Sequence, residues 1–203
     1  MFYIRYGKRA FDLVGAVAGL LFLAPLLLVT AIVVRLHLGR PVLFRQLRPG
    51  LRGTLFTIFK FRTMRERDPE GCDLADEYRL TVVGRLLRSM SVDELPELWN
   101  VVRGEMSLVG PRPLLPQYLM RYTPMQARRH EARPGITGWA QVNGRNELDW
   151  ERKFELDVWY VDHISVWFDL KILLLTAGEI FKRRGINQDG HATAQEFLGS
   201  EKQ

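Results

Sequence analysis

Two adjacent carboxylates, Asp93 and Glu94, stand in the stretch "SVDELPELWN" at residues 91–100, with Pro96 shortly after them. Because neighbouring side chains on a helix point about 100° apart, we expect the two acids to have different tasks rather than to face one substrate atom. Pro96 cannot donate a backbone N–H and is best tolerated in a first turn, which predicts that the pair lies at a helix start or a kink. Amide groups there favour a bound anion.

Basic residues near glycine and proline motifs, or near the acid pair, point to phosphate chemistry. They are Arg112, which lies between two prolines, and Lys60, Arg62, Arg88 and Arg145. Arginine forks match phosphate oxygens in two-point geometry, and Mg²⁺ typically uses one or two carboxylates plus substrate phosphates. A carboxylate can also attack phosphorus and form an acyl phosphate. The set therefore favours phosphoryl transfer, which depends on positioning and charge neutralisation.

Other interpretations of the same residues stay open, because each signal is weak alone. An acid pair is most often solvated surface, and a scattered arginine is most often solubilising. Glycosidases also use two carboxylates, about 5 to 9.5 Å apart, but that chemistry explains neither the arginines nor the hydrophobic start of the chain. The histidines at positions 37, 130, 163 and 191 have no metal-like spacing and receive no role.

The elements that must position these residues begin with an apolar stretch over residues 10–34. It is too long for a secretory signal and long enough for a membrane helix, which needs about 20 apolar residues. Basic residues flank both ends, and positive flanks favour the cytoplasm, so we expect both ends on the cytoplasmic side. A straight span cannot satisfy both flanks.

A proline bend resolves this conflict. Pro25 removes one backbone hydrogen bond, so we expect Ala24 and Pro25 to mark the bend of a re-entrant helix that enters one leaflet and returns. A conventional single span and a buried helix of a water-soluble domain are the alternatives. Asp12 is expected to pair with Lys8 or Arg9, or else to stay a simple interfacial charge.

The remaining segments alternate strand and helix signals. They predict a hairpin or two short strands over 42–64, a charged surface loop over 65–79, and a helix over 80–102 with weak points at Gly84 and Pro96. An extended run over 110–116, a helix over 117–131 and a glycine-punctuated loop over 133–145 follow. Residues 150–184 predict one or two amphipathic helices, whose aromatic and basic side chains suit a lipid headgroup layer as well as a protein core.

Length and charge restrict the partners. With 203 residues the chain suits one cooperative unit, and its net charge of +6 favours partners that carry phosphate or anionic lipid. Its single cysteine, Cys72, excludes an internal disulfide and fits a reducing compartment. The hydrophobic start argues against a nucleic-acid binder, so we expect no nucleic acid among the partners.

In collinear order the motifs resemble those of the bacterial monotopic phosphoglycosyl transferases. The matching stretches are "KRAFD", "FRQLRPG", "FKFRTM", "SVDELPELWNVVRGEMSLVGPRP", "RPGITGWAQVNGR" and "FDLKILLLT", which together span nearly the whole chain. The likeness is to the minimal catalytic form, without an added multi-span domain, and the "GHATAQEFLG" tail resembles members that use N,N′-diacetylbacillosamine. One departure is Ala24, where the family often has a serine or another small residue before the proline.

The resemblance implies transfer of sugar 1-phosphate from a UDP-sugar to undecaprenyl phosphate, with release of UMP. By analogy Asp93 is the nucleophile and helps to hold Mg²⁺, while Glu94 organises the metal or handles a proton. Arg88 and Arg112 are implied phosphate ligands, and the weaker candidates are Lys60, Arg62 and Arg145. A non-catalytic membrane anchor and a single-step transferase are the alternatives.

The expected fold is α+β and mainly α. Residues 1–40 would form the re-entrant membrane helix and its flanks, and residues 41–203 a compact cytosolic catalytic domain with a small β-hairpin and amphipathic interfacial helices. The implied location is the cytoplasmic face of the bacterial inner membrane, in contact with phospholipids and at the first membrane step of glycoconjugate assembly, such as protein glycosylation. The sugar, the pathway and a homo-oligomer stay open.

Overall fold

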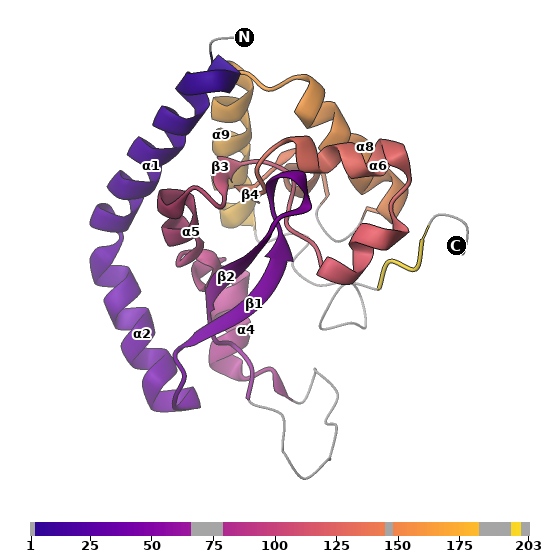
Figure 1. Ribbon diagram of the computed structural model, residues 1–203. Coiled ribbons are helices and arrows are strands. Elements are labelled where there is room, and N and C mark those ends of the chain that lie inside the picture. The colour runs from indigo at the N-terminus through magenta and orange to yellow at the C-terminus, as the bar shows by residue number, and fades with distance from the viewer. Residues whose placement is uncertain (1–2, 66–78, 145–147, 183–195, 200–203) are drawn as a thin grey trace.

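A computed structural model describes residues 3–65, 79–144, 148–182 and 196–199 (Figure 1). Helices dominate and the sheets are small, which confirms the α+β, mainly α class. The strands are β1 (Leu43–Pro49), β2 (Leu55–Phe61), β3 (Ser107–Val109) and β4 (Gly135–Thr137), and the longer helices are α1 (Lys8–Phe22), α2 (Ala24–Leu38), α4 (Val82–Ser89), α5 (Glu97–Arg103), α8 (Trp150–Asp162) and α9 (Val166–Lys182). Shorter helical turns are η1 (Tyr3–Gly7), η2 (Leu51–Gly53), η3 (Val92–Glu94), η4 (Pro116–Arg121), α6 (Pro124–Ala127), η5 (Arg128–Glu131) and α7 (Trp139–Val142).

The apolar N-terminal stretch forms two helices, α1 and α2, that meet at 63° and run down one side of the molecule in Figure 1. The break is at Leu23, one residue before Ala24, and Pro25 lies in the first turn of α2, where a missing N–H is tolerated. In the part of the chain that the structure describes, no single helix has the length and apolar character to cross a membrane, whereas this bent pair together does. The expected bend is therefore present.

Buried polar contacts hold α1 against the rest of the chain. The Asp12 carboxylate accepts hydrogen bonds from the Ser107 hydroxyl at 2.9 Å and the Leu108 N–H at 3.0 Å. Lys8 donates to Asp169 of α9 at 2.7 Å. The expected ion pair between Asp12 and a neighbouring cation is therefore wrong: at 1% exposure this carboxylate needs donors, and β3 supplies them.

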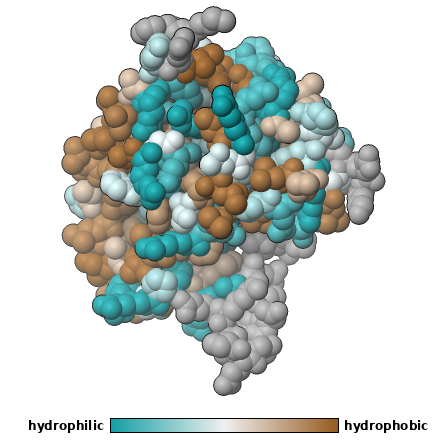
Figure 2. Space-filling view, in the orientation of Figure 1, coloured by the Kyte–Doolittle hydropathy of each residue, from teal (hydrophilic) through white to brown (hydrophobic). Residues whose placement is uncertain are grey.

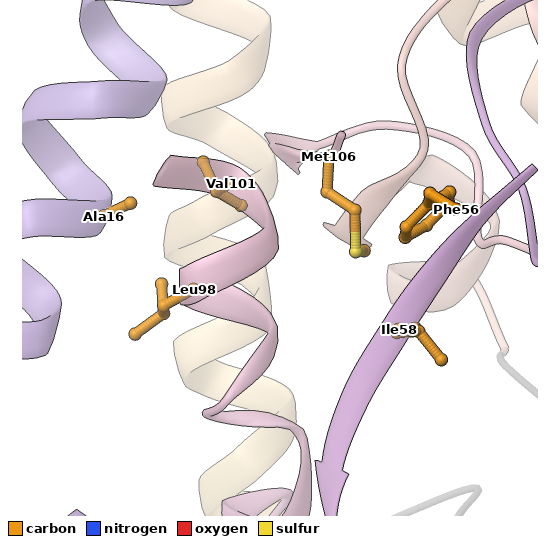
Figure 3. Close-up of a cluster of buried hydrophobic side chains, with 6 residues drawn as sticks. All are labelled: Ala16, Phe56, Ile58, Leu98, Val101 and Met106. Atoms are coloured by element: carbon orange, nitrogen blue, oxygen red, sulfur yellow. The ribbon is translucent and has the colours of Figure 1, made fainter. Parts of the chain in front are cut away.

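The predicted hairpin is confirmed. Strands β1 and β2 pair antiparallel, with Leu43 opposite Phe61 and Pro49 opposite Leu55. Strand β2 packs on α5, and α5 packs in turn on α1. The cluster drawn in Figure 3 joins them, and its members are Ala16, Phe56, Ile58, Leu98, Val101 and Met106. This packing sets the start of α5, and with it the acid pair, beside the end of β2.

The segment predicted as one helix over 80–102 is broken before the acid pair. Helix α4 ends at Ser89, and Ser91 has a left-handed backbone with φ of 55°. The single turn η3 then carries both acids, and Pro96 caps α5 without a side-chain hydrogen bond. The prediction of a helix start or kink at Pro96 is confirmed, whereas Gly84 lies inside α4 and does not break it.

Gly84 permits a close approach between α4 and Thr63, which follows β2. A Cβ atom there would lie 1.9 Å from the Thr63 carbonyl oxygen. We expect Gly84→Ala to lower the free energy of unfolding by about 3 kcal/mol, because backbone must move to admit the methyl group. Gly178→Ala in α9 is the matched control: no atom lies within 4 Å of its Cβ position, so stability should stay level or rise. Denaturant unfolding in lipid nanodiscs would measure both, and equal stability of the two variants would contradict this packing.

The run over 110–116 is extended up to Leu115, as predicted, but two segments after it differ from prediction. The helix expected over 117–131 is instead three short turns, since prolines begin η4 and α6 and Thr123 caps α6 in a capping box with Gln126. Part of the expected glycine loop is strand β4, which pairs parallel to β3 with Ser107 opposite Gly135. Absence of a Cβ at Gly135 permits this, because one would lie 2.0 Å from the Gly110 nitrogen. The two C-terminal helices are confirmed as α8 and α9.

Candidate active site

Glu94 lies at the centre of a charge cluster that joins η3, β2 and the segment after β3. Its Oε1 is 2.6 Å from Nζ of Lys60 and 2.5 Å from Nη2 of Arg112. Burial alone would raise the pKa of Glu94, but the Arg112 and Lys60 charges outweigh it and hold the pKa well below its usual range. Glu94 is therefore a fixed anion whose oxygens are already engaged by two cations.

Asp93 has the opposite environment. Its side chain is buried, at 8% exposure, and among the described residues its carboxylate has no hydrogen-bond partner. Burial, and next the Glu94 charge, raise the pKa of Asp93 to about 6. At neutral pH it is thus an ionised carboxylate with little solvation and unengaged oxygens, which is the state a nucleophile or metal ligand requires.

Glu97 is a third acid that sequence reasoning missed. Its side chain is 2% exposed, and Oε1 lies 3.0 Å from Nζ of Lys60. Burial is the main reason that its pKa rises to about 7. The signal was available, because a residue three positions after Glu94 falls on the same face of a helical turn. Lys60 therefore bridges two carboxylates and is a structural cation of the site.

Arg112 lies at the solvent side of the cluster, with 45% of its side chain exposed. The Glu94 charge is the main reason that the pKa of Arg112 rises. Arg48 of β1 lies nearby and was also missed, although the "FRQLRPG" motif contains it. Burial, and next the Arg112 charge, lower the pKa of Arg48 to about 10, so both arginines stay cationic at neutral pH. The Arg112 charge acts on Asp93, whereas Arg48 interacts with the charges of Glu94 and Glu97.

The remaining cations predicted for the site, Arg88, Arg62 and Arg145, differ in how they lie relative to the acid pair. Arg88 donates from Nε to the Thr63 hydroxyl at 3.0 Å, and its charge acts on Asp93. Arg62 is 7% exposed and donates to the Leu38 carbonyl and, at 3.1 Å, to the Arg40 carbonyl, so it anchors the end of α2. Arg145 lies outside the described residues. The structure thus brings Asp93, Glu94, Lys60, Arg112 and Arg88 together and turns Arg62 toward the backbone.

A magnesium ion fits this donor set through Asp93. In the described part of the chain, no cluster of three or more histidine, cysteine or acidic side chains is arranged to hold a metal. Such a cage is not needed, because Mg²⁺ is usually bound by one or two carboxylates and the substrate phosphates. Glu94 is occupied by two cations, so Asp93 is the residue of this pair that would hold the ion.

Comparison with known proteins decides the family. The family model described as bacterial sugar transferase matches residues 3–183. The chain belongs to the bacterial sugar transferase family. This result confirms the resemblance at family level, and it makes the protein an enzyme of the sugar transferase class.

Relatives within the sugar transferase family differ in length and in the sugar they are named for. The chain is 58% identical to the uncharacterized sugar transferase EpsL of Bacillus subtilis, over 95% of this chain and 96% of EpsL. It is 43% identical to the UDP-glucose:undecaprenyl-phosphate glucose-1-phosphate transferase of Escherichia coli, over 85% of this chain and 39% of that protein. It is 37% identical to the undecaprenyl-phosphate galactose phosphotransferase of Salmonella typhimurium, over 89% of this chain and 42% of that protein. The chain thus spans nearly all of EpsL but less than half of the two transferases named for a sugar.

Proposed function

We propose that this protein transfers sugar 1-phosphate from a UDP-sugar to undecaprenyl phosphate in two steps. The observation that carries the proposal is the contrast within the acid pair: Glu94 is held by Lys60 and Arg112, whereas Asp93 is buried, ionised and unengaged. The names of relatives support the substrates, since the Escherichia coli and Salmonella typhimurium proteins are named for undecaprenyl phosphate and a sugar.

The two steps balance at a single phosphorus atom. In the first, an Asp93 oxygen attacks the sugar-bearing phosphorus, its bond to the bridging oxygen breaks, and UMP leaves with the electron pair. In the second, a phosphate oxygen of undecaprenyl phosphate attacks the same phosphorus and displaces the Asp93 carboxylate. The products are UMP and a polyprenyl diphosphosugar, and the enzyme is regenerated.

The surrounding residues neutralise and orient charge. Arg112 and Arg88 offer guanidinium groups to the diphosphate oxygens. The Arg112 side chain is oriented by its hydrogen bond to the Glu94 carboxylate. Mg²⁺, when bound at Asp93, supplies charge neutralisation on those oxygens. Glu97, with a pKa of about 7, is able to hold or release a proton within the cluster at neutral pH.

Magnesium binding should follow the titration of Asp93. We expect its carboxyl carbon to titrate near pH 6 in the free protein, and to titrate lower when Mg²⁺ and UDP are added, because a bound cation favours the ionised form. Carbon-13 NMR of aspartate-labelled protein would measure the midpoint, with Asp93→Asn identifying the resonance and UDP without Mg²⁺ as the control. A midpoint that Mg²⁺ leaves unchanged would contradict a metal-binding role for Asp93.

We also propose that α1 and α2 form a re-entrant membrane helix on the cytoplasmic face of the bacterial inner membrane. Figure 2 shows hydrophobic residues gathered along the edge that these helices form in Figure 1. Their exposed apolar side chains are Leu13, Val14, Val17, Leu21, Phe22, Leu26, Leu28, Val29, Ile32 and Leu36. Such a surface suits phospholipid rather than water. Cysteine labels near residues 5 and 40 should both be protected from an impermeant periplasmic reagent, and labelling at one end only would indicate a true span.

The identity of the donor sugar is the most specific part of the proposal. The tail resemblance favours an N-acetylated or dideoxy sugar such as N,N′-diacetylbacillosamine, whereas named relatives use glucose or galactose. A panel of UDP-sugars assayed for UMP release with undecaprenyl phosphate would decide among them. No release with any sugar would contradict transfer from a UDP-sugar to undecaprenyl phosphate.

A further inference from the structure

The segment Pro111 to Pro113 carries the site arginine and has a single backbone N–H of its own, that of Arg112. Two of its three residues are prolines, which have no N–H, so the segment is held by donors that reach its carbonyl oxygens. Pro111 accepts from the Gly135 N–H at 3.0 Å, and Pro113 accepts from Arg48 at 3.4 Å. The carbonyl of Arg112 itself accepts from Nη2 of Arg129 at 2.7 Å.

Arg129 is built into the interior for this task. It is 2% exposed, and its Nε and Nη2 donate to Oδ2 of Asp157 in α8 at 3.1 and 2.7 Å. Nη1 donates to the Tyr122 hydroxyl at 3.2 Å. Arg129 makes four hydrogen bonds here, two to the aspartate, one to the phenol and one to the Arg112 carbonyl. A guanidinium is a planar fork with five N–H donors, whereas an ammonium group has three donors and cannot make all four.

Residues 196–199 pack against the aromatic rings that surround Arg129. Phe197 is 1% exposed and stacks on Tyr122 with ring centroids 5.9 Å apart. It also meets Phe154 edge-on at 5.0 Å, and the Arg129 guanidinium lies over the Tyr122 and Phe154 rings. A continuous chain of contacts therefore runs from Phe197 through Tyr122 and Arg129 to the backbone of Arg112.

We infer that Arg129 is a positioning residue of the transferase: it fixes the backbone of Arg112 so that the Arg112 side chain engages Glu94 and the substrate phosphate, and Phe197 in the C-terminal tail secures Arg129. The inference rests on the proposed function, because it assigns the effect of Arg129 to Arg112. Displacements of about 1 Å at a positioned group can cost a hundredfold in rate, so a loss in this range is expected from a small shift.

A double-mutant cycle tests this. Arg129→Lys keeps the charge beside Asp157 but removes the fork, and kcat/KM for UMP release should fall about tenfold or more when Arg112 is present. In the Arg112→Ala background the same change should alter kcat/KM less than about twofold, because the group that Arg129 positions is gone. The adjacent Arg128→Lys is the matched control: Arg128 also pairs with an aspartate of α8, Asp162, but at the surface, and it should leave both backgrounds unchanged.

Equal losses from Arg129→Lys in both backgrounds would overturn the inference and assign Arg129 a general structural role. If Arg129→Lys does not fold, Phe197→Ala provides a second cycle, with a loss of about threefold expected only when Arg112 is present. In that cycle too, equal losses from Phe197→Ala with and without Arg112 would overturn the inference. An Arg112→Ala variant with wild-type activity would overturn the inference as well, because it assigns the effect of Arg129 to Arg112. Absence of UMP release by the wild-type protein would instead contradict the proposed function, so the two failures are distinguishable.

Discussion

Asp93→Asn should abolish sugar-phosphate transfer and the covalent intermediate together. The amide keeps the size of the side chain but removes the charge and the nucleophilic oxygen, so kcat should fall by about 10⁴-fold or more. With UDP-sugar alone, intact-protein mass spectrometry should detect a sugar-phosphate adduct on the wild-type chain and none on the variant. Asp162→Asn is the control, because Asp162 lies at the surface of α8 and pairs only with Arg128 among the described residues.

The same variant should be at least as stable as the wild type. Burial raises the pKa of Asp93 from 3.8 to about 6, so its ionisation begins to oppose folding above pH 3.8 and does so in full above about pH 6. The amide removes that cost, and a gain of about 1 to 3 kcal/mol in the free energy of unfolding is expected at pH 7. The gain should shrink as pH falls through 6 and vanish below the unfolded pKa, where both states are protonated.

Two outcomes would contradict the role of Asp93 as the nucleophile. A wild-type protein that turns over without any adduct, together with appreciable turnover by Asp93→Asn, would exclude the nucleophile assignment and favour a single-step transfer through a ternary complex. Loss of activity accompanied by lower stability at pH 7 would instead mean that Asp93 supports the fold.

Lys60→Met should have the second largest effect, and it should act on stability as well as on activity. The ammonium group lies between Glu94 and Glu97, at 2.6 and 3.0 Å. Without it two buried carboxylates face each other with less compensation, and the free energy of unfolding should fall by about 3 kcal/mol. Transfer should fall strongly too, because Glu94 then loses one of the cations that fix it.

A second substitution checks the cause. Glu97→Gln in the Lys60→Met background should restore part of the lost stability, since it removes one of the opposed charges. Lys171→Met in α9 is the control, because that lysine lies on an exposed part of the helix. Denaturant unfolding in nanodiscs gives all four values, and a Lys60→Met protein as stable as the wild type would show that the ion pairs contribute no net stability.

Much of the fold followed from local patterns. The hairpin around Pro49 and Gly50, the bend before Pro25 and the two C-terminal helices depend on turn chemistry and on hydrophobic periodicity over neighbouring residues. The helix predicted over 117–131 failed because its prolines and the Thr123 cap divide it into short turns. Strands β3 and β4 were missed because three-residue strands have too little alternation to be recognised, and their pairing depends on close approach at Gly135.

By itself the sequence determined the inventory of the site: an acid pair before a proline, cations in fixed motifs, and a bent apolar helix before them. Only the tertiary structure decided what each charge does. Lys60 and Glu94 are 34 positions apart, so their ion pair depends on how β2 packs against η3. That packing leaves Asp93 unengaged, adds Glu97 and turns Arg62 toward the backbone of α2. Local periodicity cannot report these outcomes, because a carboxylate's charge and reactivity depend on its solvation and on partners brought to it from distant parts of the chain.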